Sequence, residues 1–281
     1  MFDPTSRSEA AGGVARQRSR GRARLGVEAG GKGGGRLDEF FQEGCAKLRL
    51  PREDGGAFEA VVINTAGGLT GGDRFEVAVT VGAGAAASVS GQACEKIYKA
   101  SAGTAEVMTG LVLEDGARLD WLPQPTILFD RCALRRTTDI RLAGPARLLA
   151  VESLVFGREA MGERLGTAAI HDAWRVHRDG RLVLADAFAI DGPVADRLAG
   201  PALLGANRAT ATVVLAAPDA EGFLAPVREL LGEASGPAGA SLVAGILVIR
   251  LAAPDGEALG RDLQRLLTFL RGRPLPRVWF C

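Results

Sequence analysis

The chain has 281 residues and a formal charge of only +1, with 24% charged and 5% aromatic side chains. This length suits one large domain or two small ones, with a sizeable buried core. Residues 1–36 carry eight basic and three acidic side chains, so the remaining chain is slightly acidic. A slightly acidic body argues against nucleic-acid binding, which needs a basic face. No window approaches the length of apolar sequence that a membrane span requires.

The four cysteines are widely spaced and form no Cys-x-x-Cys pair; they are Cys45, Cys94, Cys132 and Cys281. The first residues contain no apolar segment of the kind that a signal peptide needs. Reduced thiols in a cytoplasmic protein are the interpretation that this pattern favours.

Residues 1–20 are rich in Ser, Arg, Ala and Gly and lack apolar periodicity, which predicts a disordered basic tail. The run from Gly30 to Gly35 predicts a flexible turn between two early strands. From Leu37 to about Ala217, alternating segments such as Phe75–Val81 predict strand after strand. Gly, Pro or Asp separates them at intervals of about 8 to 12 residues, as in all-β domains. The Asp-Gly pair within Arg178–Arg181 predicts a hairpin turn.

Two helices are predicted late in the chain, from about Gly222 to Leu231 and from Glu257 to Arg271. The second places five leucines on one face, as expected for an amphipathic helix. Asp255 is its predicted N-cap and Gly272 its predicted end. Between the helices, the apolar run Leu242–Leu251 predicts a strand.

A glycine-rich loop, NTAGGLTGGDRF, separates two of the predicted strands. Its glycines are Gly67, Gly68, Gly71 and Gly72. Glycine is needed where φ is positive or where another backbone comes close. The spacing imitates the start of a phosphate-binding loop, but Asp73 and Arg74 stand where lysine and a hydroxyl residue belong. The loop is therefore interpreted as a tight structural connection, with Asp73 either a cap or a site residue.

Four further motifs accompany this loop: GQACEKIYK (residues 91–99), LPQPTILFDRCALRRTTDIRL (122–142), ESLVFGREAMGE (152–163) and DAWRVHRDGRLVLAD (172–186). With weaker similarity from about Gly21 to the closing LPRVW, the chain resembles the urease accessory protein UreD (UreH) family. These proteins are maturation factors for the nickel enzyme urease. One departure is Cys94, where a small residue is expected.

The resemblance implies a mainly β fold, an irregular β-helix-like stack of many strands with about two C-terminal α-helices. A single domain over residues 21–281 is expected, although residues 217–281 could form a β/α sub-domain. The resemblance also implies a chaperone without enzymatic activity. It would link the structural subunits of apo-urease to UreF, and through UreF to the GTPase UreG, and pass Ni²⁺ to the urease active site. The nickel would be transient, with no tightly bound cofactor.

In this family an internal tunnel lined by acidic and polar side chains is proposed to carry nickel. The matching positions here are Asp73, Gln92, Glu95, Asp139 and Glu152. Oxygen ligands bind a borderline metal only moderately, which suits an ion that must move on. The alternative is that Arg135, Arg136 or Lys96 pairs with these carboxylates for structural reasons.

A tight metal site is not predicted. His171 and His177 are six residues apart on a predicted strand, so they lie about 20 Å apart and cannot share an ion. No cluster of Cys and His has the spacing of a ligand set. Cys94 is interpreted as a buried, protonated thiol that behaves as a small apolar side chain.

Phe156, Arg158 and Met161 are interpreted as partner contacts, since such residues are enriched in interface cores. The alternative is that Phe156 and Met161 insert into the core. Trp279 and Phe280 could anchor a partner or close the core.

Two rival functions remain open at this point. One is a β-solenoid hydrolase that uses paired carboxylates, although no Gly-x-Ser-x-Gly motif is present. The other is a structural or oligomeric β protein without a metal.

Overall fold

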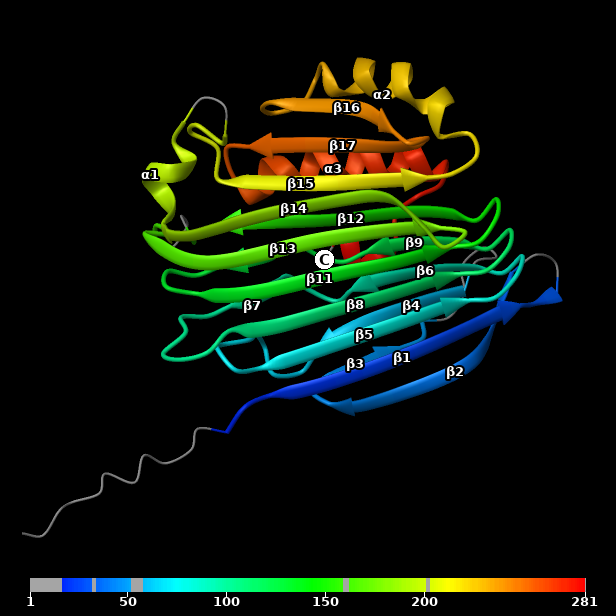
Figure 1. Cartoon of the computed structure of the whole chain (residues 1–281), viewed down its shortest axis with the longest axis horizontal. Helices are drawn as coiled ribbons and strands as arrows, with labels where there is room; N and C mark the ends of the chain where they lie inside the picture. The colour runs from blue at the N-terminus through cyan, green and yellow to red at the C-terminus, as the bar shows by residue number, and fades with distance from the viewer. Residues whose placement is uncertain (1–16, 32–33, 52–57, 159–161, 201–202, 281) are drawn as a thin grey trace, which may run out of the picture.

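The computed structural model describes residues 17–31, 34–51, 58–158, 162–200 and 203–280. The chain is built mainly from strands arranged in two stacked sheets, with helices toward the C-terminal end (Figure 1). Residues 1–16 of the predicted tail lie outside the described residues, and the first strand begins at Arg20. None of the described helices is long and apolar enough to cross a membrane.

The first sheet has seven strands in the order β14-β13-β11-β8-β5-β1-β2 and faces the viewer in Figure 1. These strands are β1 (Arg20–Ala29), β2 (Gly35–Gly44), β5 (Arg74–Val81), β8 (Ala105–Leu113), β11 (Ala133–Leu142), β13 (Thr167–Arg178) and β14 (Arg181–Pro193).

The second sheet has the order β16-β17-β15-β12-β9-β6-β4-β3, and the short strands β7 and β10 pair beside β12. Its strands are β3 (Ala46–Arg49), β4 (Phe58–Asn64), β6 (Ala86–Gly91), β7 (Glu95–Ile97), β9 (Arg118–Leu122), β10 (Thr126–Leu128), β12 (Arg147–Phe156), β15 (Ala209–Ala216), β16 (Ala238–Val243) and β17 (Ile246–Ala253).

From β4 to β13 the chain passes from one sheet to the other and back, and each strand pairs in parallel with the strand one turn earlier. This is the irregular β-helix-like stack that was expected. In the first sheet, Arg74 pairs with Glu106, Glu106 with Arg135, and Arg135 with His171. These steps of 32, 29 and 36 residues are unequal, which explains why no repeat is visible in the sequence.

Alternation along the strands builds the core between the two sheets. In β5, Phe75, Val77, Val79 and Val81 are buried, and the residues between them face outward. Successive side chains of a strand point to opposite faces, so one face of each sheet supplies this core. Burial of such aliphatic side chains contributes about 25 cal/mol for each Å² of apolar surface removed from water.

A second core lies between the outer face of the second sheet and helix α3 (Gly256–Arg271), which runs behind β15 and β17 in Figure 1. The five predicted leucines of α3 are all buried. As predicted, Asp255 caps the helix, since its Oδ1 accepts a hydrogen bond from Ala258 N at 2.8 Å. The helix ends at Gly272, which has a φ of 63°.

The other C-terminal elements follow the prediction less closely. The helix expected near residues 222–231 is a 3₁₀ turn (Ala220–Phe223) followed by α2 (Leu224–Leu231). The predicted strand Leu242–Leu251 is wrong as a single strand, because Ala244 and Gly245 turn the chain between β16 and β17. Helix α1 (Val194–Leu198) was not predicted. A last 3₁₀ turn spans Arg277–Phe280.

The C-terminal elements belong to the same sheet as the preceding strands. β15 pairs with β12, β17 with β15 and β16 with β17, so these three strands extend the second sheet directly. This arrangement favours packing against the sheets over a separate sub-domain. The hairpin at Arg178–Arg181 is confirmed, with a φ of 50° at Asp179 and 77° at Gly180.

Replacing Asp255 with alanine removes the side-chain cap of α3 and leaves the Ala258 amide without its acceptor. We expect a loss of about 1 kcal/mol in the free energy of unfolding, measured by urea denaturation. Glu257→Ala in the same turn is the control. Its side chain is 85% exposed, and we expect a change within about 0.5 kcal/mol. Equal effects of the two substitutions would contradict the capping role.

Candidate functional site

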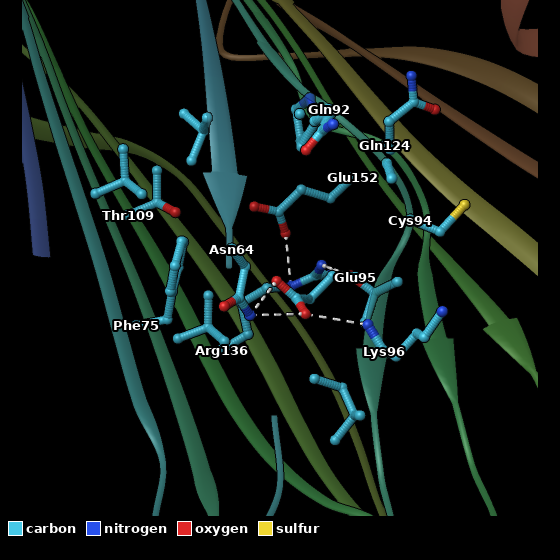
Figure 2. A pocket seen from close by; sticks show the side chains of 18 of the residues that line it. Asn64, Phe75, Gln92, Cys94, Glu95, Lys96, Thr109, Gln124, Arg136 and Glu152 are labelled. Carbon is cyan, nitrogen blue, oxygen red and sulfur yellow. Dashed lines mark hydrogen bonds and ion pairs between the residues drawn. The ribbon is translucent and has the colours of Figure 1, made fainter. Parts of the chain in front are cut away.

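A cavity of about 320 Å³ lies between the two sheets (Figure 2). Strands β5, β8 and β11 supply one wall, and β4, β9 and β12 supply the other. Gly67, residues 91–97, Pro123, Gln124 and Thr126 complete the lining. Its polar lining residues are Asn64, Gln92, Glu95, Lys96, Thr109, Gln124, Thr126, Arg136 and Glu152.

Three of the predicted passage residues meet in this cavity, namely Gln92, Glu95 and Glu152. Both carboxylate oxygens of Glu95 accept hydrogen bonds at 3.1 Å from the Asn64 side-chain amide. The Lys96 amide also donates to Glu95 Oε1. Burial raises the pKa of Glu95, and the Asn64 and Lys96 contacts oppose that effect.

A buried charged cluster lies at the cavity, with Arg136 on β11, Asp172 on β13 and Glu152 on β12. Arg136 donates two hydrogen bonds to Asp172, from Nε to Oδ1 at 3.0 Å and from Nη2 to Oδ2 at 2.5 Å. Arg136 Nη1 donates to Thr126 Oγ1 at 3.1 Å. Asp172 does not line the cavity, so it holds Arg136 from behind the wall.

Glu152 is bound less completely than Asp172. Its Oε1 accepts a hydrogen bond from Thr138 Oγ1 at 2.6 Å. Its Oε2 lies 3.0 Å from Arg136 Nε, but the N–H points to Asp172, so this oxygen receives no hydrogen bond from another described residue. Burial is the main cause that raises the pKa of Glu152 to about 7; Arg136 lowers it, Asp172 raises it further, and hydrogen bonding from the Thr138 and Trp174 side chains lowers it.

Trp121 adds an unpaired donor to the same cavity. Its Nε1 is buried and has no hydrogen-bond partner among the described residues. An indole N–H can only donate, whereas Glu152 Oε2 can accept. Buried polar groups are costly without partners, so the cavity wall contains one donor and one acceptor whose hydrogen-bonding capacity is unused by the described residues.

Asp73 lies outside this cavity and caps the glycine loop. Its Oδ1 accepts a hydrogen bond from Ser19 N and its Oδ2 accepts one from Thr70 N, both at 2.8 Å. Its side chain is buried, and both oxygens serve the backbone. The structural interpretation of Asp73 therefore fits the geometry, and a place on the cavity wall does not.

The glycines of this loop are needed for close approach, as the sequence suggested. A Cβ on Gly68 would lie 2.4 Å from the Tyr98 ring and 2.8 Å from Lys96 O. A Cβ on Gly71 would lie 2.4 Å from the carbonyl oxygen of Ala102. Gly67 and Gly72 have φ values of 74° and 91°, which disfavour other residues. The loop thus packs against the segment that includes Glu95 and Lys96.

Asp139 also lies away from the cavity. It is on the outer face of β11, its side chain is 46% exposed, and it pairs with Arg141 at 3.3 Å. Successive residues of β11 alternate in direction, so Arg136 and Thr138 face inward while Asp139 faces solvent. The geometry does not support Asp139 as a wall residue.

The proposed partner contacts need correction at one residue. Phe156 is wrong as an exposed contact, because it is buried between the sheets and its ring meets Phe188 edge-on at 6.0 Å. Arg158 is partly exposed and pairs with Glu163. Met161 lies outside the described residues. Trp279 closes the second core, while Phe280 is 65% exposed.

Cys94 is exposed beside the cavity, so the interpretation of a buried cysteine is wrong. Its side chain points away from Glu152 in Figure 2. Partial burial of the thiol is the main cause that raises its pKa, so it stays protonated at neutral pH. Both histidines are on β13. Among the described residues, no group of three or more His, Cys, Asp or Glu side chains could hold a metal ion.

Asp172 and Trp121 were not identified from the sequence as site residues. A signal was present for Asp172, because it occupies the inward phase of β13 with Ile170, Trp174 and Val176. A carboxylate within an apolar phase predicts a buried ion pair. Trp121 offers no comparable signal, since a tryptophan in the inward phase of a strand is normally part of the hydrophobic core.

Comparisons with known proteins agree over nearly the whole chain. A family model described as UreD urease accessory protein matches residues 19–280. A urease accessory protein UreD from Rhizobium leguminosarum bv. trifolii (strain WSM2304) is 50% identical over 271 residues, covering 96% of this chain and 98% of that protein. One from Xanthobacter autotrophicus (strain ATCC BAA-1158 / Py2) is 47% identical over 264 residues, covering 94% and 91%.

The raised pKa of Glu152 predicts a pH-dependent stability. The unfolded chain loses this proton near its ordinary pKa of 4.5, while the folded chain keeps it until about 7. The stabilisation from the bound proton is therefore full below the unfolded value and is lost as the pH rises through the folded value. Glu152→Gln cannot titrate. We expect its unfolding free energy, relative to the original chain, to rise between pH 4.5 and 7. A difference that stays constant across this range would contradict the assignment.

Proposed function

Since the chain belongs to the UreD family of urease accessory proteins, we propose that it is a scaffold that passes nickel to the urease active site. Membership establishes a role in urease maturation, as an accessory protein and not an enzyme. The scaffold and nickel roles are the proposed part. The scaffold would link apo-urease to UreF and, through UreF, to the GTPase UreG.

The single observation that carries the nickel proposal is the carboxylate of Glu152, a residue that lines the cavity and whose Oε2 has no hydrogen-bond partner among the described residues. Arg136, Asp172 and ionised Glu152 together carry one net negative charge. In a site of reduced dielectric constant such a charge attracts a divalent cation strongly. A cation can also replace the proton that Glu152 holds.

The donor set suits passage better than storage. Glu95 and Glu152 offer carboxylate oxygens, and Asn64, Gln92 and Gln124 offer amide oxygens. Such ligands hold Ni²⁺ less firmly than imidazole or thiolate does. The thiol of Cys94 is protonated, which makes it a poor ligand. An ion that must leave needs binding that is favourable but weak.

The rival hydrolase is not supported by the cavity. Asp172 is held by two hydrogen bonds from Arg136, and both oxygens of Glu95 accept from Asn64, so Glu152 has no free carboxylate beside it to form an acid–base pair. The family to which the chain belongs is also one of accessory proteins. A cytoplasmic location is part of the proposal. Cys45, Cys94 and Cys132 are free thiols, which fits a reducing compartment.

The passage of nickel is tested by measuring the activation of purified apo-urease by this chain, its partners and Ni²⁺. Glu152→Gln removes the open carboxylate and should lower the rate of activation about tenfold, because a charged oxygen ligand is lost. Glu95→Gln should lower the rate by a smaller factor, since Asn64 already occupies both of its oxygens. Asp139→Asn is the matched control and should leave the rate unchanged. Full activation by folded Glu152→Gln would reject a passage through this cavity.

The scaffold role has a separate test. Co-purification should recover the chain with UreF, and with apo-urease, in the absence of added nickel, because the proposed linkage depends on surfaces and not on the ion. UreG should join only when UreF is present. Failure to bind both UreF and apo-urease would reject the scaffold while leaving the cavity proposal to its own test.

A further inference from the structure

Asp172 lies behind the wall of the cavity and reaches its interior only through Arg136. Its side chain is 10% exposed, and the side chain of Arg136 is 8% exposed. The two parallel hydrogen bonds between them form a bidentate pair, the strongest arrangement available to these groups. This pair fixes the plane of the guanidinium.

A third N–H of the guanidinium, on Nη1, donates to Thr126 Oγ1. All three nitrogen atoms of Arg136 therefore donate to Asp172 or Thr126. Glu152 keeps the electrostatic attraction of Arg136 at 3.0 Å but receives none of its hydrogen bonds. Its Oε2 is left as a buried acceptor without a hydrogen-bond donor from Arg136.

The charges of the cluster also indicate that Arg136 neutralises Asp172 and leaves the charge of Glu152 unbalanced. One guanidinium neutralises one carboxylate, and the bidentate geometry assigns that carboxylate to be Asp172. The excess negative charge then falls on Glu152, the carboxylate of the cluster that lines the cavity. Without the charge of Asp172, Arg136 would have Glu152 as its only carboxylate within the ion-pairing distances observed.

We propose that Asp172 is a positioning residue for the passage of the cation: by holding Arg136, it keeps Glu152 Oε2 open to a divalent ion. This inference rests on the proposed function. The proposal also gives Arg136 a role. Its positive charge reduces the net negative charge of the site, while its hydrogen bonds go to Asp172 and Thr126 and do not block Glu152. Support from residues behind the ligands typically changes metal affinity or activity by about 10- to 100-fold.

The test is the substitution Asp172→Asn, which keeps the shape of the side chain but removes its charge. Arg136 should then turn its hydrogen bonds to Glu152, and the rate of urease activation with Ni²⁺ should fall about tenfold. Asp120→Asn is the matched control. Asp120 also pairs with two arginines, Arg271 and Arg273, but it lies outside the cavity and should not affect activation.

A second variant separates positioning from general structural support. The double substitution Arg136→Gln with Asp172→Asn removes the pair without leaving an uncompensated arginine, so Glu152 stays open. We expect it to activate urease faster than Asp172→Asn alone. A residue that only stabilised the fold would give the opposite order. Thermal unfolding of each variant confirms that folded protein is compared. If Asp172→Asn does not fold, the double variant should still activate urease, and an inactive folded double variant would overturn the proposal.

The two proposals fail in different ways. Full activation by Asp172→Asn, together with a loss in Glu152→Gln, would overturn the positioning role and leave the passage intact. Full activation by Glu152→Gln would overturn the passage itself. A double variant no faster than folded Asp172→Asn would also overturn the positioning role.

Discussion

The space between the two sheets is the constraint on which the rest of the structure depends. Stacked sheets lie about 10 Å apart, so alternate residues of every strand must fill a shared layer. Along most of the stack, leucine and valine fill it, as Val79, Leu111 and Leu119 do. At the level of Arg136 the layer contains charges instead, and charged side chains cannot interdigitate as aliphatic ones do. The cavity is the space that this polar level leaves.

Several segments that lie outside the cavity stabilise this polar layer. The glycine loop packs against the segment that carries Glu95, because Gly68 admits the Tyr98 ring and Asp73 fixes the loop backbone. At the other side, the Gln124 side chain donates to Val278 O, which ties the C-terminal turn to the cavity rim. Trp279 donates to Leu122 O nearby. Segments far apart in sequence are thus needed to form one cavity.

Local features of the fold could be predicted because local chemistry determines them. Asp255 and Gly272 bracket α3, and Asp179-Gly180 forms the hairpin, since each depends on a few neighbouring residues. The direction of Asp139 was also available from the sequence. Leu134, Ile140 and Leu142 mark the inward phase of β11, and Asp139 is out of phase with them. The same rule places Phe156 inward with Leu154.

The meeting of Arg136, Asp172 and Glu152 could not be predicted in this way. Arg136 and Asp172 are neighbours because β11 and β13 pair side by side. Glu152 joins them only because β12 lies in the opposite sheet at the same level. The phase of each strand predicts that all three side chains face inward, but the unequal steps of the stack hide which inward residues share a level. The sequence thus limits the candidates, and the stacking selects among them.

Placing an arginine beside an open carboxylate has a physical consequence for an ion in transit. Two buried carboxylates alone would hold a divalent cation firmly, because little water screens them. Arg136 cancels one of the two charges and lies within 3.0 Å of the Glu152 oxygen, so an arriving cation meets attraction and repulsion together. Removing Arg136 would strengthen the binding of the cation. Breaking its pair with Asp172 would let the arginine itself occupy the position beside Glu152. The paired arrangement keeps the site both accessible and shallow, which is the condition for onward movement.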